Sequence, residues 1–212
     1  LRAPLETSLD VQDGVDATTV ATDLEALLAN PAEPLRGLFE PCAKHLLADA
    51  RQLRLHAVVR LLLTVARQVR PATYHHAVRA AALAGALAHQ VQAPHGFAPR
   101  AMLAGLIHDL GEIYVNPDYL DARRQLDLTE YRQLAAHPQV GAMLLRELTD
   151  YPDELARAVL EHHERMDGTG YPGQTLGSAL SPMGQLLGVV ELVLGIADGR
   201  PAVGARAAFA LK

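Results

Sequence analysis

The sequence predicts an all-α protein, because its composition and its hydrophobic pattern both indicate this class. Half of the 212 residues are hydrophobic, yet only 4% are aromatic and there is no Trp. Alanine and leucine, which favour helices, supply most of the apolar residues. No convincing run alternates apolar and polar residues as a half-buried strand would. A chain of this length can bury a sizeable core, as one large domain or as a domain with a helical appendage.

Apolar residues recur at three- and four-residue spacings through much of the chain, as in amphipathic helices. In residues 53–69, Leu and Val alternate in this way with arginines. Asp127 with Glu130 is typical of a capping box, and Ser181 before Pro182 is typical of a helix start. We expect helices over residues 53–69, 73–92, 99–109, 127–136, 138–148, 152–164, 182–198 and 202–211.

The chain is expected to divide near residue 70. Residues 1–20 are polar and lack a clear period, which indicates a linker or the frayed tail of an upstream segment. A helical pattern follows from Thr22 to about Arg70. We therefore expect an N-terminal linker and helical segment over 1–70, and a domain with the candidate chemistry over 71–212. Two roles stay open for the first segment: dimerisation, which would give a homodimer, or part of a sensory domain.

Charge and hydropathy exclude several classes of partner. The formal net charge is −5 and no long cluster of Lys or Arg occurs, so a long nucleic acid is not expected to bind. The longest nearly uncharged apolar stretch, residues 186–197, contains Glu191 and is too short to span a bilayer. No signal peptide is visible, and the single cysteine, Cys42, cannot form an internal disulfide. We expect a cytoplasmic protein without membrane insertion.

The first candidate site is His108 with Asp109, at the end of the apolar run that begins at Leu103. Burial of these two groups is costly unless something compensates them. A divalent cation would do so, because neutral imidazole and carboxylate can both bind it. A histidine–aspartate pair that faces the surface is the alternative.

The second candidate site runs from Glu161 to Pro172, where two consecutive histidines lead into a loop rich in Gly and Pro. Neighbouring imidazoles repel one another once they are protonated, which disfavours a purely structural role. The glycines of the loop allow backbone conformations that are closed to other residues, and close approach to a ligand.

Glu191 is the third candidate, because it lies in the middle of a helical stretch that is apolar on nearly every face. Either metal ligation or a buried ion pair with an arginine would compensate its charge. His76 and His137 would each, alone, be ordinary structural or surface histidines. The remaining histidines have no ligand-like context: His45, His56, His75, His89 and His95.

Together these residues resemble the HD-GYP phosphodiesterases, a bacterial branch of the HD superfamily that hydrolyses cyclic di-GMP. The family patterns are His with Arg three residues later, HD-x-G-K, HP-x-x-G, HHE-R-x-DG-x-GYP, and a late Asp nine residues before Arg-Pro. The resemblance runs from about Thr73 to Pro201, and its specific part is the string of 11 residues from His162 to Pro172. The other matches are His76 with Arg79, His108-Asp109-Leu110-Gly111, His137-Pro138 with Gly141, and Glu191 with Arg200-Pro201.

The resemblance implies an HD-superfamily helical bundle that holds two divalent metal ions, with Asp109 bridging them. Iron or manganese suits a set of His and carboxylate ligands, and zinc or nickel could bind in vitro. One ion would be held by His76, His108, Asp109 and Glu191, and the other by His137, His162, His163 and Asp109. The implied catalytic residues are His108, Asp109 and Glu112, and the implied substrate-binding residues are Arg165, Gly170, Tyr171, Pro172 and Arg200.

The activity implied is hydrolysis of cyclic di-GMP to linear pGpG, and further hydrolysis to GMP stays open. In the family, the Gly-Tyr-Pro loop is also associated with diguanylate cyclase partners, so residues 170–172 are a candidate contact surface. Two alternatives to cyclic di-GMP hydrolysis stay open. One is a catalytically degenerate module that binds metal or nucleotide and signals through protein contacts. The other is a hydrolase of another phosphate ester.

The chain departs from the family pattern at positions that contact substrate more than at metal ligands. Glu112 stands where the family has Lys, which would weaken binding of an anionic substrate or add a carboxylate to the metals. Ala72 replaces a glutamate that some members use for a third metal, so we expect two ions. The other departures are Gln185 for Arg, Leu194 for Asp, and Ala202 and Val203 for Tyr and a basic residue.

Overall fold

The computed structural model describes residues 14–199, and this part of the chain contains helices and no strand. The all-α class is therefore confirmed. Short 3₁₀ turns cover Glu40–Cys42, Leu110–Tyr114, Pro117–Leu120 and Gly177–Ala179. The α-helices are α1 Ala17–Ala29, α2 Arg36–Phe39, α3 Ala43–Arg51, α4 Ala57–Val69, α5 Pro71–Gln90, α6 Phe97–Ile107, α7 Leu128–Ala135, α8 His137–Leu148, α9 Asp153–Glu161 and α10 Pro182–Ala197.

The long helix α5 lies at the centre of the fold and is buried on nearly every face. Its alanines leave room for α6 to pack closely, with Gly105 at the crossing. A Cβ on Gly105 would lie 2.7 Å from the carbonyl oxygen of Ala80, so the two backbones touch there. The alanine-rich composition thus serves close helix packing, because a wider side chain at this crossing would separate α5 from α6.

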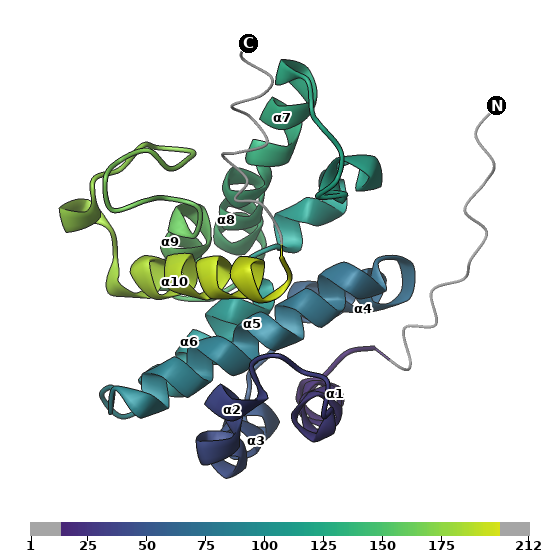
Figure 1. The fold of residues 1–212 in the computed structure, drawn as a ribbon, viewed down its shortest axis with the longest axis vertical. Helices are drawn as coiled ribbons and strands as arrows, with labels where there is room; N and C mark the ends of the chain where they lie inside the picture. The colour runs from purple at the N-terminus through teal and green to yellow at the C-terminus, as the bar shows by residue number, and fades with distance from the viewer. Residues whose placement is uncertain (1–13, 200–212) are drawn as a thin grey trace.

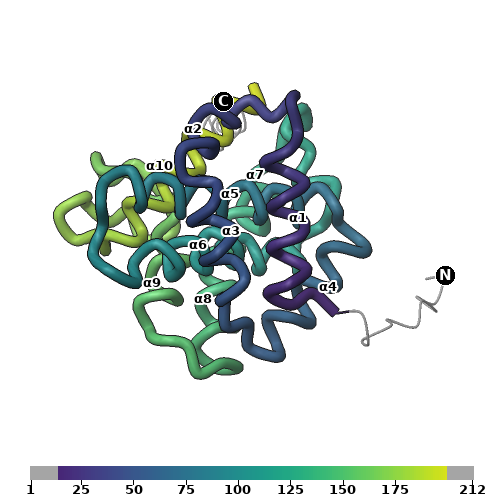
Figure 2. The backbone as a smooth tube through the Cα atoms, turned by 90° about the horizontal axis from the view of Figure 1, so that it is seen from below, coloured from purple at the N-terminus to yellow at the C-terminus, as the bar shows by residue number. Residues whose placement is uncertain are grey.

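The other helices surround this pair in two groups (Figure 1). Helices α1, α2 and α3 cover one side of α5, and α8, α9 and α10 cover the other, as the view from below also shows (Figure 2). One hydrophobic core extends from Val15 to Leu194 through both groups. The division of the chain at residue 70 stays a prediction.

Most predicted helices occur, with boundaries that differ by a few residues. The capping box of Asp127 and Glu130 is confirmed, and the Ser181 side chain accepts a hydrogen bond from the Gly184 N–H at the start of α10. Helix α1 begins at Ala17, inside the stretch expected to be a linker, because the Asp16 carboxylate caps its first turn. The helix predicted over 202–211 lies outside the described residues.

Two of the predicted helices are shorter than expected. Helix α4 begins at Ala57 rather than at residue 53, since the His56 ring accepts a hydrogen bond from the Val58 N–H and so caps its start. Helix α9 ends at Glu161, so His162 and His163 follow it instead of continuing it. Between residues 14 and 199, no helix combines the length and the apolar character needed to cross a membrane.

Candidate metal centre

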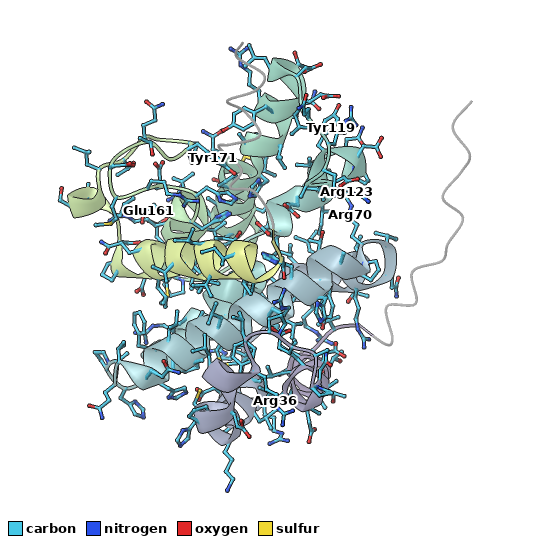
Figure 3. All side chains as sticks on the ribbon, viewed as in Figure 1. Arg36, Arg70, Tyr119, Arg123, Glu161 and Tyr171 are labelled. Atoms are coloured by element: carbon cyan, nitrogen blue, oxygen red, sulfur yellow. The ribbon has the colours of Figure 1, made fainter. Side chains whose placement is uncertain are left out.

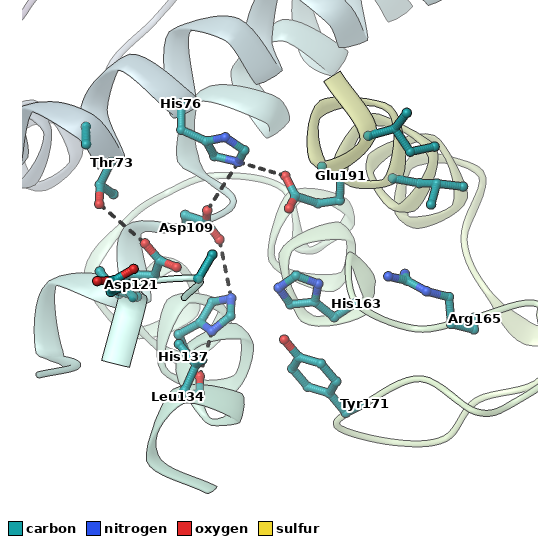
Figure 4. Close-up of a pocket in the computed structure, with 17 residues that line it drawn as sticks. Thr73, His76, Asp109, Asp121, Leu134, His137, His163, Arg165, Tyr171 and Glu191 are labelled. Carbon is teal, nitrogen blue, oxygen red and sulfur yellow. Dashed lines mark hydrogen bonds and ion pairs between the residues drawn. The ribbon is translucent and has the colours of Figure 1, made fainter. Parts of the chain in front are cut away.

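Seven imidazole and carboxylate side chains from five helices meet on one side of α5. They come from the second turn of α5, the ends of α6 and α9, the start of α8 and the middle of α10. The five named by Figure 4 point toward a common centre, and His108 and His162 are almost inaccessible to solvent, at 1% and 0% exposure. The full set is His76, His108, Asp109, His137, His162, His163 and Glu191.

One group of four ligand atoms surrounds the Glu191 carboxylate. Its Oε1 atom lies 3.0 Å from His76 Nε2 and 2.9 Å from His108 Nε2. Asp109 Oδ2 completes the group, at 3.1 Å from His108 Nε2 and 3.6 Å from His76 Nε2. All four atoms lie within 4.8 Å of one another, close enough to surround one ion. Glu191 therefore lies beside two imidazoles, and not beside an arginine as the alternative interpretation required.

The other group of four uses the second oxygen of the same aspartate. Asp109 Oδ1 lies 3.3 Å from His137 Nε2 and 3.4 Å from His162 Nε2, and the two ring nitrogens are 3.2 Å apart. His163 is the fourth member, with its ring 4.1 Å from that of His162 between centroids. Asp109 thus directs one oxygen to each group, which is the arrangement expected of a carboxylate that bridges two cations.

Three of the histidines are oriented by the ends of helices. His108 Nδ1 donates to the Gly105 carbonyl at 2.7 Å, His137 Nδ1 donates to Leu134 at 2.7 Å, and His162 Nδ1 donates to Val159 at 2.6 Å. Each acceptor lies three residues earlier, in the last turn of a helix, where carbonyls lack intrahelical donors. These bonds place a proton on each Nδ1 and direct each Nε2 at the centre, where the neutral ring offers its lone pair.

This orientation provides a test of whether a cation fits. Because His137 and His162 both donate through Nδ1, their Nε2 atoms direct lone pairs at each other across 3.2 Å. Two lone pairs so close repel one another unless a cation or a proton lies with them. His108 Nε2 and Asp109 Oδ1 are also buried without a hydrogen bond. Divalent cations would satisfy all of these atoms, so the donor set fits metal ions.

The charges of the cluster are mutually dependent. Burial raises the pKa of Asp109 and of Glu191, but the neighbouring histidines outweigh burial and hold both pKa values well below their usual range. Burial lowers the pKa of His162 and His163, so these rings are neutral at pH 7. Ionised carboxylates and neutral imidazoles are the forms that bind a metal.

Gly111 allows the two sides of the centre to approach each other. It lies in the turn after Asp109 and packs against the first turn of α8. A Cβ on Gly111 would overlap the His137 carbonyl oxygen and lie 2.9 Å from the Gly141 N–H nitrogen. The glycines of two separate sequence motifs therefore lie against each other, and their lack of side chains brings His137 to Asp109.

Two buried glutamates that flank the histidine pair position the chain around it, and the sequence analysis assigned neither of them this role. Glu161 Oε2 accepts from Ser181 N at 2.8 Å and from Ser181 Oγ at 2.5 Å, which ties α9 to the start of α10 (Figure 3). Glu164 accepts from Gly173 N at 2.5 Å and Thr175 N at 3.0 Å. The sequence signal for these roles was an acidic residue on each side of the pair His162 and His163.

We expect Glu164→Gln to loosen the loop at residues 170–175. The amide keeps the size of the side chain but has one acceptor oxygen, so one of the two loop N–H groups loses its partner. The expected cost is about 1 kcal/mol of stability, with faster hydrogen exchange in this loop measured by mass spectrometry. Asp167→Asn is the control, since the Asp167 side chain accepts from Thr169, two residues later, and not from the N–H groups of Gly173 and Thr175. Equal exchange in both variants would contradict the role of Glu164.

A cavity of about 460 Å³ is lined by five of the seven side chains: His76, Asp109, His137, His163 and Glu191. Tyr171 forms part of its wall, with its ring stacked on His163 at 4.7 Å between centroids (Figure 4). The Tyr171 hydroxyl is buried without a hydrogen-bond partner in the described structure. Burial, together with nearby acidic groups, raises the pKa of Tyr171 well above its usual value, so the hydroxyl remains a donor.

Glu112 lies in the wall of the same cavity, partly buried, with its Oε2 3.5 Å from Thr73 Oγ1. Burial and the charge of Asp109 raise the pKa of Glu112 to about 7. Its backbone is held in place by Arg70, which donates to the carbonyls of Glu112 and Val115 at 2.5 and 2.7 Å.

The predicted substrate-binding residues do not all line the cavity. Arg165 lines the cavity with Tyr171, while Gly170 packs against the Glu164 backbone. Pro172 follows Tyr171 in the same loop. Arg200 lies outside the described residues. Thr73, Leu192 and Ile196, which the sequence analysis did not propose, also line the cavity.

Comparison with known proteins agrees with this arrangement. A family model described as "HD domain" matches residues 60–199. A cyclic di-GMP phosphodiesterase of Pseudomonas aeruginosa is 35% identical over 129 residues, which is 61% of this chain and 31% of that protein. A 3'3'-cGAMP-specific phosphodiesterase of Vibrio cholerae is 30% identical over 131 residues, or 62% of this chain and 28% of that protein.

A third relative, a response-regulator cyclic di-GMP phosphodiesterase of Xanthomonas campestris, is 28% identical over 100 residues, or 47% of this chain and 26% of that protein. The chain thus spans less than a third of the length of each of these relatives. The family match covers well over half of the chain and includes all seven side chains of the centre. The chain belongs to the HD domain family, in the HD-GYP branch that its motifs predicted.

Proposed function

We propose that this chain is the hydrolase part of a metal-dependent phosphodiesterase that opens cyclic di-GMP to linear pGpG. The observation that carries the proposal is the geometry of Asp109, whose two oxygens each belong to a separate group of four ligand atoms. The printed names of the relatives, which are phosphodiesterases of cyclic dinucleotides, support the substrate class. Such an enzyme would act in bacterial second-messenger signalling.

Two divalent ions would be held by the groups described above, with iron or manganese as the expected metals and zinc or nickel as alternatives. When bound, they supply Lewis acidity, which neutralises phosphoryl oxygens and promotes the ionisation of water. The substitution of Ala72 for a carboxylate supports two ions and not three. His108 and Asp109 act from the end of α6, so their positions depend on the packing of that helix.

The remaining groups of the cavity would bind and orient the dinucleotide. The Tyr171 hydroxyl is a free donor beside His163, suited to a phosphoryl oxygen. The Arg165 guanidinium lines the same cavity and would pair with a phosphate. Leu192 and Ile196 give the cavity an apolar surface against which a nucleobase can lie while water is displaced.

The test is turnover of cyclic di-GMP by purified protein loaded anaerobically with iron or with manganese. We expect linear pGpG, detected by liquid chromatography, with GMP as a second product if hydrolysis continues. A parallel reaction with 3'3'-cGAMP compares the two substrates that the names of the relatives contain. Absence of any turnover with every metal would reject the proposal.

A degenerate signalling module is the second candidate, and Glu112 is the observation that favours it. Its carboxylate lines the cavity where the family has a lysine, so it opposes an anionic substrate. Protein contacts of this module would use the Gly-Tyr-Pro loop, with a diguanylate cyclase-type partner, beside the exposed side chains of Met166 and Leu176. The homodimer and the cytoplasmic location stay predictions.

We expect Glu112→Lys to raise kcat/KM for cyclic di-GMP on the order of tenfold, about 1.4 kcal/mol. Above pH 7, where Glu112 is mostly ionised, the substitution replaces a repulsive charge in the cavity wall by an attractive one. Most of the gain should therefore be a lower KM, measured from initial rates at such a pH. Glu25→Lys is the matched control, because Glu25 is exposed on α1 and undergoes the same change of charge. A fall in kcat would instead show that Glu112 contributes to catalysis.

A further inference from the structure

A buried arginine connects three parts of the chain that are far apart in sequence. Arg79 lies on α5, three residues after His76, and is only 6% exposed. Its Nη1 donates to Asp198 Oδ1 at 2.6 Å, and its Nη2 donates to Glu33 Oε1 at 3.1 Å. Asp198 follows the last residue of α10, and Glu33 belongs to the connection between α1 and α2. In Figure 2, this connection lies on the same side of the molecule as the end of α10.

The arginine depends on its two carboxylates because it is largely buried and has little contact with bulk water. Burial lowers the pKa of Arg79, but hydrogen bonds to Asp198 and Glu33 outweigh burial and leave the pKa above its usual value. Glu33 is itself buried and also accepts from Leu35 N at 3.1 Å, so its carboxylate is fixed to the N-terminal segment. Removal of one partner of a buried ion pair is strongly unfavourable.

The arginine makes a second polar link, beside that of His76 with Glu191, between α5 and the end of α10. His76 binds Glu191 at 3.0 Å, and Arg79 binds Asp198 at 2.6 Å. His76 and Arg79 are three residues apart, so they lie on one face of α5. Glu191 and Asp198 are seven residues apart, so they lie on one face of α10 and its end. Together the two links fix both the distance and the register of α10 against α5 on the side of the metal centre.

The apolar packing of α10 does not extend to its end. Leu194 is the last buried residue of the helix, and Ile196 is 72% exposed. A Cβ on Gly195 would meet no described atom within 4 Å. Beyond Leu194, the link from Arg79 to Asp198 joins the end of α10 to α5, and Glu191 lies less than two turns before Asp198.

We propose that Glu33 is a positioning residue for Glu191, acting through Arg79 and Asp198. Glu33 fixes the direction of the guanidinium, so that Nη1 points at Asp198 and the last turn of α10 stays against α5. The N-terminal segment thereby takes part in the group formed by His76, His108, Asp109 and Glu191, while the group around His137 and His162 does not depend on it. The inference rests on the proposed function, in that both groups bind cations.

The test compares Mn²⁺ binding to the full chain after removal of metal with a chelator, by isothermal titration and by electron paramagnetic resonance. We expect two ions in the wild-type chain. In Glu33→Gln, we expect one ion to bind as before and the dissociation constant of the other to rise about fivefold or more, the usual range of coupling between sites. Glu40→Gln, an exposed glutamate of the same segment, is the control and should match the wild type.

A second comparison assigns the weakened ion. In a His76→Ala background, where the first group has already lost a ligand, Glu33→Gln should cause no further loss, because coupled residues are not additive. Asp198→Asn keeps the N-terminal segment unchanged and should weaken the same ion, which keeps the test decisive if Glu33→Gln folds poorly. Circular dichroism and the melting temperature report the folding of each variant.

The outcomes separate the inference from the proposed function. A wild-type chain that binds no ion would overturn both. A wild-type chain with two ions, beside a Glu33→Gln chain that holds both ions as tightly or holds both equally less tightly, would overturn the inference alone. Unequal weakening confined to the group that contains Glu191 would support it, since a general loss of stability affects both groups.

Discussion

Asp109→Asn is expected to abolish the binding of at least one metal ion and to lower kcat/KM at least about 100-fold, or roughly 2.7 kcal/mol. The reason is that each Asp109 oxygen faces a different group of ligands: Oδ2 lies 3.1 Å from His108 Nε2, and Oδ1 lies 3.3 Å from His137 Nε2. Asparagine has the same size but presents an oxygen to only one group and an NH₂ to the other. It also removes the negative charge that the two cations would share.

Metal content by inductively coupled plasma mass spectrometry and initial rates with cyclic di-GMP check this prediction together. Asp118→Asn is the matched control, because Asp118 has an exposed side chain in the 3₁₀ turn at Pro117–Leu120 and lies away from the seven ligands. An Asp109→Asn chain that retains two ions and its activity would show that the aspartate does not bridge the centre.

Gly111→Ala is expected to lower the free energy of unfolding by about 3 kcal/mol, at the upper end of the range for overpacked sites. The added methyl group would overlap the His137 carbonyl, and the nearby Gly141 backbone leaves no space to which it could turn. The atoms that must move belong to the backbone, so no side-chain rotation can remove the overlap. The first turn of α8 would shift and take His137 away from Asp109.

Urea denaturation at equilibrium measures the loss, and metal content shows whether the centre is affected. Gly37→Ala is the control, since a Cβ at Gly37 meets no atom within 4 Å and a helical alanine is favoured over glycine by about 0.5–1 kcal/mol. If Gly111→Ala proved as stable as Gly37→Ala, the close approach of the two motifs would not be a requirement of the fold.

The helices and the members of the metal centre could be predicted from sequence because their signals are local. Asp127 with Glu130, and Ser181 with Pro182, identify helix starts through contacts within one turn. His108 and Asp109 lie at the end of an apolar helix, and at 1% exposure His108 rules out the surface-facing alternative. Two of the histidines without ligand-like context have ordinary roles: His56 caps α4, and His89 pairs with Asp49 at 2.8 Å.

The relations between distant residues could not be predicted in this way. Glu33 and Asp198 meet on Arg79 only because α1, α5 and α10 pack together, and no short pattern in the sequence connects them. The early end of α9 depends on contacts of Glu161 and Glu164 with residues up to 20 positions later. The helical pattern in the sequence continues past the end of α9, because it reflects only the local preference of the chain.

The three histidines that donate to helix-end carbonyls both face the metal centre and complete the hydrogen bonding of a helix. These two roles affect which residues are conserved among relatives. His108, His137 and His162 complete the hydrogen bonding of α6, α7 and α9, so selection for folding would preserve them in a descendant that had lost its chemistry. His76 and His163 make no hydrogen bond through Nδ1, so this atom does not stabilise the described fold. In a relative that has lost its activity, His76 and His163 should be the first to be substituted. Their presence is therefore a more informative sign of an active enzyme.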